Sequence, residues 1–213
     1  MLVARFGRGL ILLAEIPRRD LPRFPLASII SPEAGNVMLK LVIFAVASVI
    51  IIWVSWAPLQ VRDRRSHGFF RFFAWESILA LILLNVEYWF TEPFSMPQLI
   101  SWLLLCASLF LVAHGVYLLR VIGKPQGQFE NTTTLVKLGA YRFIRHPLYS
   151  SLLLLAWGVF FKHASLLGCV LALVATAFLV ATARIEEREN MNKFGNDYAA
   201  YMKTTKMFIP FVF

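Results

Sequence analysis

The chain alternates between long apolar blocks and short polar stretches. Three blocks are each close to the ~20 residues that a helix needs to cross a bilayer. A fourth block, residues 148–183, is too long for one span, and Lys162 and His163 divide it into a short and a longer helix. The predicted spans are residues 38–56, 72–90, 99–119, 148–161 and 166–183. This pattern predicts an all-α polytopic integral membrane protein with about five transmembrane helices.

Composition supports the same class. Of the 213 residues, 59% are hydrophobic, against roughly 45–50% in ordinary soluble domains. The net charge of +9 comes from Lys and Arg that flank the apolar blocks, a pattern that argues against a nucleic-acid-binding surface. Cys106 and Cys169 lie inside apolar blocks, and no Cys-x-x-Cys or His/Cys cluster exists, so we expect neither a disulfide nor a bound metal.

Three domains follow from this layout. Residues 1–37 alternate arginines with apolar residues between prolines, which predicts an amphipathic segment at the membrane interface. Residues 38–119 hold three transmembrane helices. Residues 120–213 combine a two-helix membrane hairpin with most of the unusual polar residues.

The loops indicate an orientation. Lys and Arg gather after the first and third spans and in the C-terminal tail, whereas the loop around Glu92 has none. The positive-inside rule therefore predicts that the basic loops and the C-terminus face the cytoplasm. Five spans then place the N-terminus on the opposite side, which conflicts with its five arginines. An N-terminal segment on the cytoplasmic surface would require four or six crossings.

The stretch TTTLVKLGAYRFIRHPLY, residues 132–149, carries the first candidate chemistry. Gly139 can take a positive φ or let a ligand approach the backbone closely. Pro147 favours an extended His146 and can open the next helix as its first residue. The free N–H groups of that helix suit a carboxylate. The alternative is a simple loop-to-helix corner with snorkelling arginines.

A second group of candidate functional residues lies in the stretch ARIEERENMNKFGNDYAAYM, residues 183–202. Adjacent Glu186 and Glu187 oppose the basic trend of the other flanks, whereas Glu189 suits ordinary surface pairing. Gly195 is expected to break the helix, and Asn196 or Asp197 to cap a second short one. Five residues at spacings of three and four are expected to share a face: Glu187, Met191, Phe194, Tyr198 and Tyr201.

Taken in order, GAYRFIRHPLY, an apolar hairpin, the pair EE, FGNDYAAY and a late IP resemble the isoprenylcysteine carboxyl methyltransferase family and the related membrane phospholipid methyltransferases. The resemblance covers about residues 120–210. It implies S-adenosylmethionine as cofactor, S-adenosylhomocysteine as product, and a cytoplasmic pocket. The residues that match its cofactor motifs are Leu135, Val136, Gly139, Tyr141, His146, Pro147, Tyr149, Glu186 and Glu187.

The acceptor side is less defined by the motifs. Some members carry an arginine four residues before the acidic pair, where this chain has Thr182, so Arg184 is a candidate for that role. Glu76 and His114 lie inside predicted spans, about 7–9 Å from the cytoplasmic end, and ionisable groups there are functional candidates. The expected catalytic residues are therefore Glu187, Arg184, His114 and Glu76. The alternative for Glu76 and His114 is a hydrogen bond between helices.

The predicted activity is methyl transfer to a lipid-like or lipidated acceptor that enters from the bilayer, either at a carboxyl oxygen or at an amine. Such a transfer needs alignment and desolvation more than strong acid–base chemistry. No Gly-x-Gly-x-x-Gly follows a strand, which excludes a Rossmann-type domain. The alternatives are a membrane NADPH-dependent sterol-type reductase, and a small transporter or scaffold without catalysis.

Overall fold

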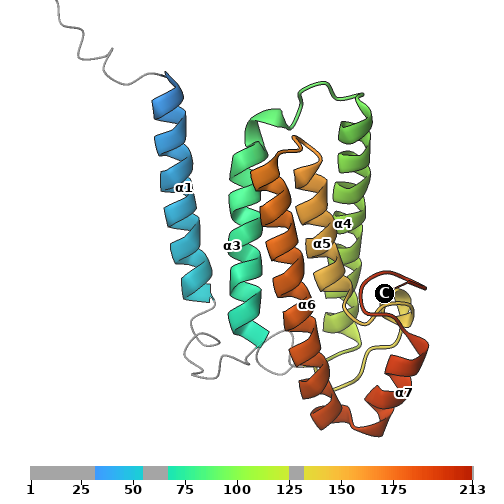
Figure 1. Ribbon diagram of the computed structural model, residues 1–213. Coiled ribbons are helices and arrows are strands. Elements are labelled where there is room, and N and C mark those ends of the chain that lie inside the picture. Colours follow the sequence, from blue (N-terminus) through green and yellow to red (C-terminus); the bar gives the residue numbers. More distant parts are fainter. Residues whose placement is uncertain (1–31, 55–66, 125–131, 213) are drawn as a thin grey trace, which may run out of the picture. The chain divides into compact units, whose positions relative to one another are not determined.

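The computed structural model describes residues 32–54, 67–124 and 132–212 (Figure 1). Two predictions fall on other residues and lie outside this description. They concern residues 1–31 of the N-terminal interfacial segment and the basic stretch of residues 62–65 after the first span.

The chain divides into two units, Met1–Leu39 and Lys40–Phe213, each described by itself. In the first unit, the described residues form the start of helix α1, which spans Pro32–Val54 and continues into the second unit. This helix starts before the predicted residue 38 because Pro32 is suited to the first turn, where its missing N–H is not needed. The hydropathy pattern located the apolar part of the helix and not its polar first turn.

The second unit is helical apart from turns and one isolated bridge between Ile144 and Lys206 among the described residues. Its remaining elements are α3 (His67–Asn85), the 3₁₀ turn η2 (Val86–Tyr88), α4 (Met96–Val121), the 3₁₀ turn η3 (Gly139–Arg142), α5 (Pro147–Phe160), α6 (Leu166–Phe194) and α7 (Asn196–Thr204). Among the described residues, four helices are long and apolar enough to cross a membrane: α1, α3 with η2, α4 and α6. Helix α5 is a shorter apolar helix. The predicted all-α polytopic membrane fold is confirmed.

Two helices end at places other than the limits of their apolar blocks. Helix α6 continues to Phe194, whereas the apolar pattern ends near residue 183. The 3₁₀ turn η2 replaces the last part of the span predicted to reach residue 90. Loss of hydrophobicity marks where the membrane ends, and a helix of Arg, Glu and Met continues into water because these residues have high helix propensity.

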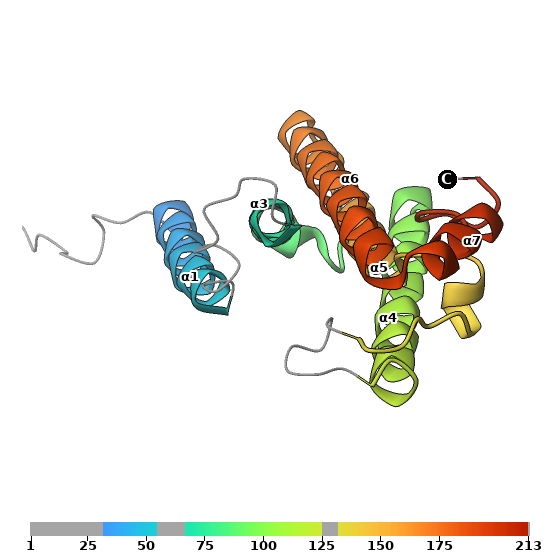
Figure 2. The same cartoon turned by 90° about the horizontal axis from the view of Figure 1, so that it is seen from below.

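The helices pack in a fixed neighbour order. Helix α4 lies against α5, α3 lies against α6, and α5 also contacts α3 and α6 (Figure 2). Small residues mediate these contacts, with Ala156, Ala172 and Ala175 fully buried. At Gly158 of α5, an added Cβ would lie 3.0 Å from the Leu105 side chain of α4. Small residues of this kind let membrane helices approach closely.

A polar cluster fixes the turn between α5 and α6. The Lys162 ammonium donates to Gln98 Oε1 at 2.9 Å and lies 3.4 Å from the ring centroid of Trp102. Nearby, Asn85 Nδ2 donates to the Val159 carbonyl at 2.8 Å. The sequence marked Lys162 only as a break between two apolar segments, whereas the structure makes it a contact between α4 and the hairpin turn. This turn lies at the end of the bundle opposite α7 (Figure 1).

Candidate active site

Residues 139–147 form a bend, called here the elbow, that leads into α5. Gly139 has φ +58°, and a Cβ there would collide with the His114 and Leu118 side chains of α4. Only glycine fits both the backbone angle and the contact. Pro147 is the first residue of α5, and His146 is its N-cap with φ −123°. The positive φ predicted for Gly139 and the helix-opening position predicted for Pro147 are confirmed, whereas the extended backbone predicted for His146 is wrong, because its ψ is 61°.

The C-terminal strap, residues 205–208, holds the elbow in place. Its backbone runs parallel to residues 143–146, with Lys206 N donating to Phe143 O at 3.0 Å and Arg145 N donating to Lys206 O at 2.8 Å. His146 N donates to Met207 O at 3.2 Å. The strap therefore satisfies the backbone groups of the elbow that no helix can satisfy.

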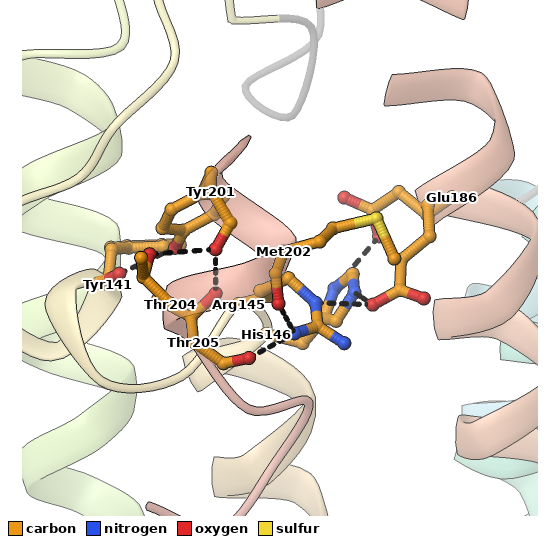
Figure 3. A network of polar contacts seen from close by, with 9 residues as sticks. Tyr141, Arg145, His146, Glu186, Tyr201, Met202, Thr204 and Thr205 are labelled. Atoms are coloured by element: carbon orange, nitrogen blue, oxygen red, sulfur yellow. Dashed lines mark hydrogen bonds and ion pairs between the residues drawn. The ribbon is translucent and has the colours of Figure 1, made fainter. Parts of the chain in front are cut away.

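His146 lies between the two adjacent glutamates. Its Nδ1 is 3.8 Å from Glu186 Oε2, and its Nε2 is 3.5 Å from Glu187 Oε1. The imidazole side chain is 3% exposed, and its Nε2 has no hydrogen-bond partner among the described residues. Figure 3 shows the imidazole directed at the end of α6 that carries both carboxylates. The structure thus brings together two motifs that are forty residues apart in the chain.

The two glutamates have different surroundings. Glu187 is buried, and its Oε1 accepts from Arg145 Nε at 2.6 Å. The same guanidinium donates to the carbonyls of Met202 and Thr205, which ties α6 to the end of α7 (Figure 3). Glu186 is 30% exposed and faces the pocket described next. Glu187 is therefore the internal partner of Arg145 and His146, and Glu186 is the carboxylate available to a ligand.

A pocket of about 640 Å³, counting its open mouth, lies beside the elbow. Its enclosed part is about 70 Å³, below the ~300–1,000 Å³ of typical small-molecule sites, so a nucleotide-sized ligand would also occupy the open mouth. Its walls come from α4, the elbow, the start of α5, the end of α6 and α7. The lining residues are Leu119, Thr132, Leu135, Val136, Tyr141, Arg145, His146, Leu148, Tyr149, Glu186, Asn190, Phe194, Tyr198 and Tyr201. The pocket combines an apolar wall, several aromatic rings and one exposed carboxylate.

Two tyrosines of α7 form one wall of this pocket. Burial raises the pKa of Tyr198 well above its usual range, and the Glu187 carboxylate beside it adds to the rise. Burial likewise raises the pKa of Tyr201, and Tyr198 contributes. The Tyr201 hydroxyl donates to the carbonyl of Tyr141 at 2.5 Å. Both side chains therefore stay neutral at physiological pH and act as hydrogen-bonding and stacking groups.

Most residues that match the cofactor motifs gather at the pocket. Six of them line it: Leu135, Val136, Tyr141, His146, Tyr149 and Glu186. Gly139 and Pro147 shape the elbow behind the wall, and Glu187 supports His146. The sequence predicted one shared helix face from Glu187 to Tyr201. This is wrong in one respect, because α6 ends at Phe194 and the two tyrosines belong to α7. The face that lines the pocket is Glu186, Asn190 and Phe194.

The end of α6 was predicted correctly and its successor was not. Gly195 is the C-cap, with φ +55°. Asn196 or Asp197 was expected to cap the next helix, but Gly195 also occupies that position, and Asn196 is the first residue of α7. A glycine that ends one helix leaves no residue between the two helices to cap the second.

The residues expected on the acceptor side are dispersed. His114 lies under Gly139 and stacks on Phe110, with ring centroids 5.7 Å apart. Glu76 accepts from Ser48 Oγ at 2.7 Å, as in the alternative interpretation of a bond between helices. Arg184 is exposed and lines a separate cleft with Arg188. None of the three lines the main pocket, so their catalytic roles stay predictions that this geometry does not favour.

Sequence reasoning missed Arg145, Asn190 and Tyr198 as pocket residues. Arg145 directly precedes His146 in the basic stretch, but a snorkelling arginine gives the same signal. Asn190 is four residues after Glu186, so helical periodicity from that glutamate could have found it. Tyr198 could be assigned to the pocket only from the structure, because the turn at Gly195 sets the direction of α7.

Chemically, the pocket suits a ligand with a cationic part and a flat aromatic part. Glu186 can accept hydrogen bonds from an ammonium group, and the tyrosine rings can stack on an aromatic base or contact a cation. Among the described residues, no group of three or more His, Cys, Asp and Glu side chains gathers to hold a metal ion. Binding and alignment are what this arrangement offers.

Comparisons with known proteins point to one family. Residues 97–197 match the sequence profile of the phospholipid methyltransferases. The chain is 25% identical over 178 residues to methanethiol S-methyltransferase 1 of Bradyrhizobium diazoefficiens, which covers 79% of this chain and 53% of that protein. It is 24% identical over 176 residues to methanethiol S-methyltransferase of Pseudomonas deceptionensis, covering 78% and 56%. The chain spans about half the length of these curated relatives, and no solved structure matches it.

Proposed function

We propose that the chain is a member of the phospholipid methyltransferase family, whose profile residues 97–197 match, and that it is an S-adenosylmethionine-dependent methyltransferase whose cofactor binds in the pocket beside the elbow. The matched region begins at the start of α4 and ends in α7, so it includes the whole elbow and the acidic pair. The predicted catalytic region, residues 120–213, is part of this proposal.

The observation that carries the proposal is the state of His146. Its imidazole is buried, lies on the pocket wall, and leaves Nε2 without a hydrogen-bond partner among the described residues. Nδ1 lies 3.8 Å from Glu186 Oε2 and Nε2 lies 3.5 Å from Glu187 Oε1, so the two carboxylates fix the orientation of the imidazole on the wall where a ligand would lie. The exposed carboxylate of Glu186 lies on the same wall.

These residues fit the proposed cofactor. S-adenosylmethionine supplies a methyl group on a positively charged sulfur. Glu186 would hold its ammonium, and the faces of Tyr141 or Tyr149 would stack on its adenine. Tyr198 and Tyr201, both neutral, would complete a wall that keeps water from the reacting groups. Arg145 and Glu187 would keep His146 in position.

For the acceptor, we propose a small thiol. The support is that two relatives are named methanethiol S-methyltransferase, at 25% and 24% identity over most of this chain. The apolar side of the pocket, with Leu119, Leu135 and Leu148, suits a small apolar molecule. As the methyl group arrives, the thiol proton must leave, and His146 Nε2 is a candidate to accept it. A lipid-like acceptor with a carboxyl or amine group is the second candidate, favoured by the family that the profile describes.

We further propose that the pocket faces the cytoplasm. The elbow, α6 and α7 carry the basic residues Arg142, Lys193, Lys203 and Lys206 at one end of the bundle, whereas the described loop between η2 and α4 has none. A cysteine introduced at Lys203 should then react with a membrane-impermeant maleimide in inverted vesicles and not in intact cells. Labelling in intact cells would contradict this orientation.

Cofactor binding is tested by calorimetry on the purified full-length protein with S-adenosylhomocysteine. We expect micromolar binding, and at least tenfold weaker binding for Glu186→Gln and for His146→Ala. Glu189→Gln is the matched control, because it removes the same charge one turn further along α6 on an exposed site outside the pocket. A folded wild-type protein that does not bind, or an equal loss in Glu189→Gln, would contradict the proposed pocket.

The acceptor is tested separately with methyl-labelled S-adenosylmethionine. One arm adds methanethiol and measures dimethyl sulfide in the headspace. The other adds total membrane lipids and follows the label into extracted lipid. Label in dimethyl sulfide supports the thiol, and label only in lipid replaces it with the second candidate.

A further inference from the structure

One face of α6 is a continuous stripe that changes from apolar to basic. Its members are spaced by three, four or seven residues and therefore lie on one side of the helix. They are Leu166, Val170, Leu173, Ala177, Arg184, Arg188 and Met191, and all of them are exposed. Helices α3 and α5 contact other sides of α6, where Ala172, Ala175 and Leu179 are buried. In a membrane protein, such an exposed stripe faces lipid.

The length of the apolar part sets the depth of the arginines. Leu166 and Arg184 are eighteen positions apart, which corresponds to ~27 Å along a helix. The hydrocarbon core of a bilayer is ~30 Å thick. With Leu166 near one boundary, Arg184 therefore reaches the other boundary, at the level of the lipid phosphates.

At the level of Arg184, the stripe residues line a cleft between α6 and α7. Its lining residues are Arg184, Glu187, Arg188, Met191, Asn192 and Met202. The one carboxylate in the lining, Glu187, is bound by Arg145 at 2.6 Å. In the part of the chain that the structure describes, Arg184 and Arg188 form no ion pair with a carboxylate. Two guanidinium groups one helical turn apart thus border a cleft with no internal counter-ion.

We propose that Arg184 and Arg188 bind the phosphate of an anionic membrane phospholipid, whose acyl chains lie along the apolar part of the stripe. Guanidinium groups form paired, charge-assisted hydrogen bonds with phosphate oxygens. The methionines and Asn192 supply the rest of the cleft around the headgroup. This site is separate from the cofactor pocket, whose α6 residues Glu186, Asn190 and Phe194 point to the other side of the helix.

The site also contacts the proposed catalytic machinery through one residue. Glu187 lines the lipid cleft and holds Arg145 and His146 by direct contacts. An anionic phosphate at Arg184 and Arg188 would therefore lie on the back of the carboxylate that positions the imidazole.

The experiment titrates phosphatidylglycerol into the detergent-purified full-length protein and counts bound lipids by native mass spectrometry. Phosphatidylcholine and inorganic phosphate are titrated in parallel. We expect phosphatidylglycerol to bind more tightly than both, and Arg184→Gln/Arg188→Gln to weaken it by roughly fivefold for each arginine removed. The matched control is Lys203→Gln/Lys206→Gln, which removes two exposed charges from the same end outside the cleft.

Three outcomes would overturn the proposal. Equal losses in both double variants would mean that net charge alone attracts the lipid. Equal binding of phosphatidylcholine would remove the requirement for an anionic lipid, and binding of inorganic phosphate as tight as that of the lipid would make the site one for a free anion. An Arg184→Lys/Arg188→Lys variant, which keeps both charges, should retain part of the affinity, and it separates loss of the bonds from loss of folding.

Discussion

The two ends of the helical bundle each bury a cation, and they use it differently. At the elbow, Arg145 is bound by the Glu187 carboxylate and by two backbone carbonyls, and His146 beside it lines a pocket together with Glu186. At the α5–α6 turn, Lys162 is bound by Gln98 and lies over the ring of Trp102. One end supports a polar group that is free to bind a ligand, and the other connects helices.

The difference lies in the partners. A carboxylate partner such as Glu187 fixes the orientation of the Arg145 guanidinium through a charge-assisted hydrogen bond. Side chains next to Arg145 can then be held in position for a ligand. A side-chain amide and an indole face hold a cation with less directional demand, which suits a contact between helices. A buried cation is therefore insufficient as a sign of function. What distinguishes the elbow is the pocket beside it, with the exposed Glu186 carboxylate on its wall.

The largest expected effect is that of Arg145→Met. It leaves the Glu187 carboxylate buried without its cation, which typically costs about 3–5 kcal/mol of stability. We expect this loss in thermal or denaturant unfolding, together with loss of S-adenosylhomocysteine binding in calorimetry. The double variant Arg145→Met/Glu187→Met should recover part of the stability but not the binding. A double variant no more stable than the single one would show that Glu187 is not the decisive partner.

Next in size is Lys162→Met at the opposite end. The change keeps the length of the side chain but removes a charged hydrogen bond and a cation–π contact, for a loss of about 2 kcal/mol. Because this cluster contributes no residue to the pocket lining, the folded variant should bind S-adenosylhomocysteine with unchanged affinity. Lys137→Met, at an exposed lysine, is the control for stability. Weaker ligand binding by Lys162→Met would show that the two ends are coupled.

A pair of glycines tests the elbow with a smaller effect. Gly139 and Gly195 have nearly equal φ, +58° and +55°, and Gly195 has ψ −126°, so alanine strains the backbone at both positions, by about 1–3 kcal/mol. At Gly195 nothing lies within 4 Å of the new Cβ, whereas at Gly139 it meets His114 and Leu118. We expect Gly139→Ala to destabilise by about 2 kcal/mol and to weaken ligand binding, and Gly195→Ala to do neither beyond the backbone strain. Equal effects in unfolding and calorimetry would remove the special role of the elbow.

The smallest effect at neutral pH concerns Tyr198 and Tyr201. Their pKa values are raised in the folded protein, so stability is unaffected below the pKa of an unfolded tyrosine, about 10. Above it, stability falls, because unfolded tyrosines release protons that the folded ones retain. Unfolding measured from pH 8 to pH 11 should show this loss, and Tyr198→Phe should reduce it. A loss of the same size in Tyr198→Phe would assign the effect to other groups.

Much of the fold was accessible from local pattern. The apolar blocks predicted the four described helices that are long enough to cross a membrane and the shorter α5, and Lys162 with His163 marked the turn between α5 and α6. The end of α6 was accessible from Gly195, although hydropathy reported only where the membrane ends. The start of α7 was misplaced by one residue, since Gly195 both ends α6 and precedes α7.

The site residues also divide into those that the sequence identified and those that only the structure identified. His146, Glu186 and the loop residues Leu135 and Val136 could be selected because they match motifs in the chain. Arg145 could not, since an arginine beside a membrane helix serves most often as an interfacial anchor. Its function depends on Glu187, Met202 and Thr205, which reach it only when α6, α7 and the strap have folded back.

The sequence by itself determined the class of the protein, because the length and apolar character of a segment decide whether it can lie in a bilayer. It also determined where φ must be positive or fixed, at Gly139 and Pro147. Only the tertiary structure decided which of two adjacent glutamates faces the pocket. One residue along a helix turns a side chain by 100°, and the packing of α6 against its neighbours sets which direction points inward.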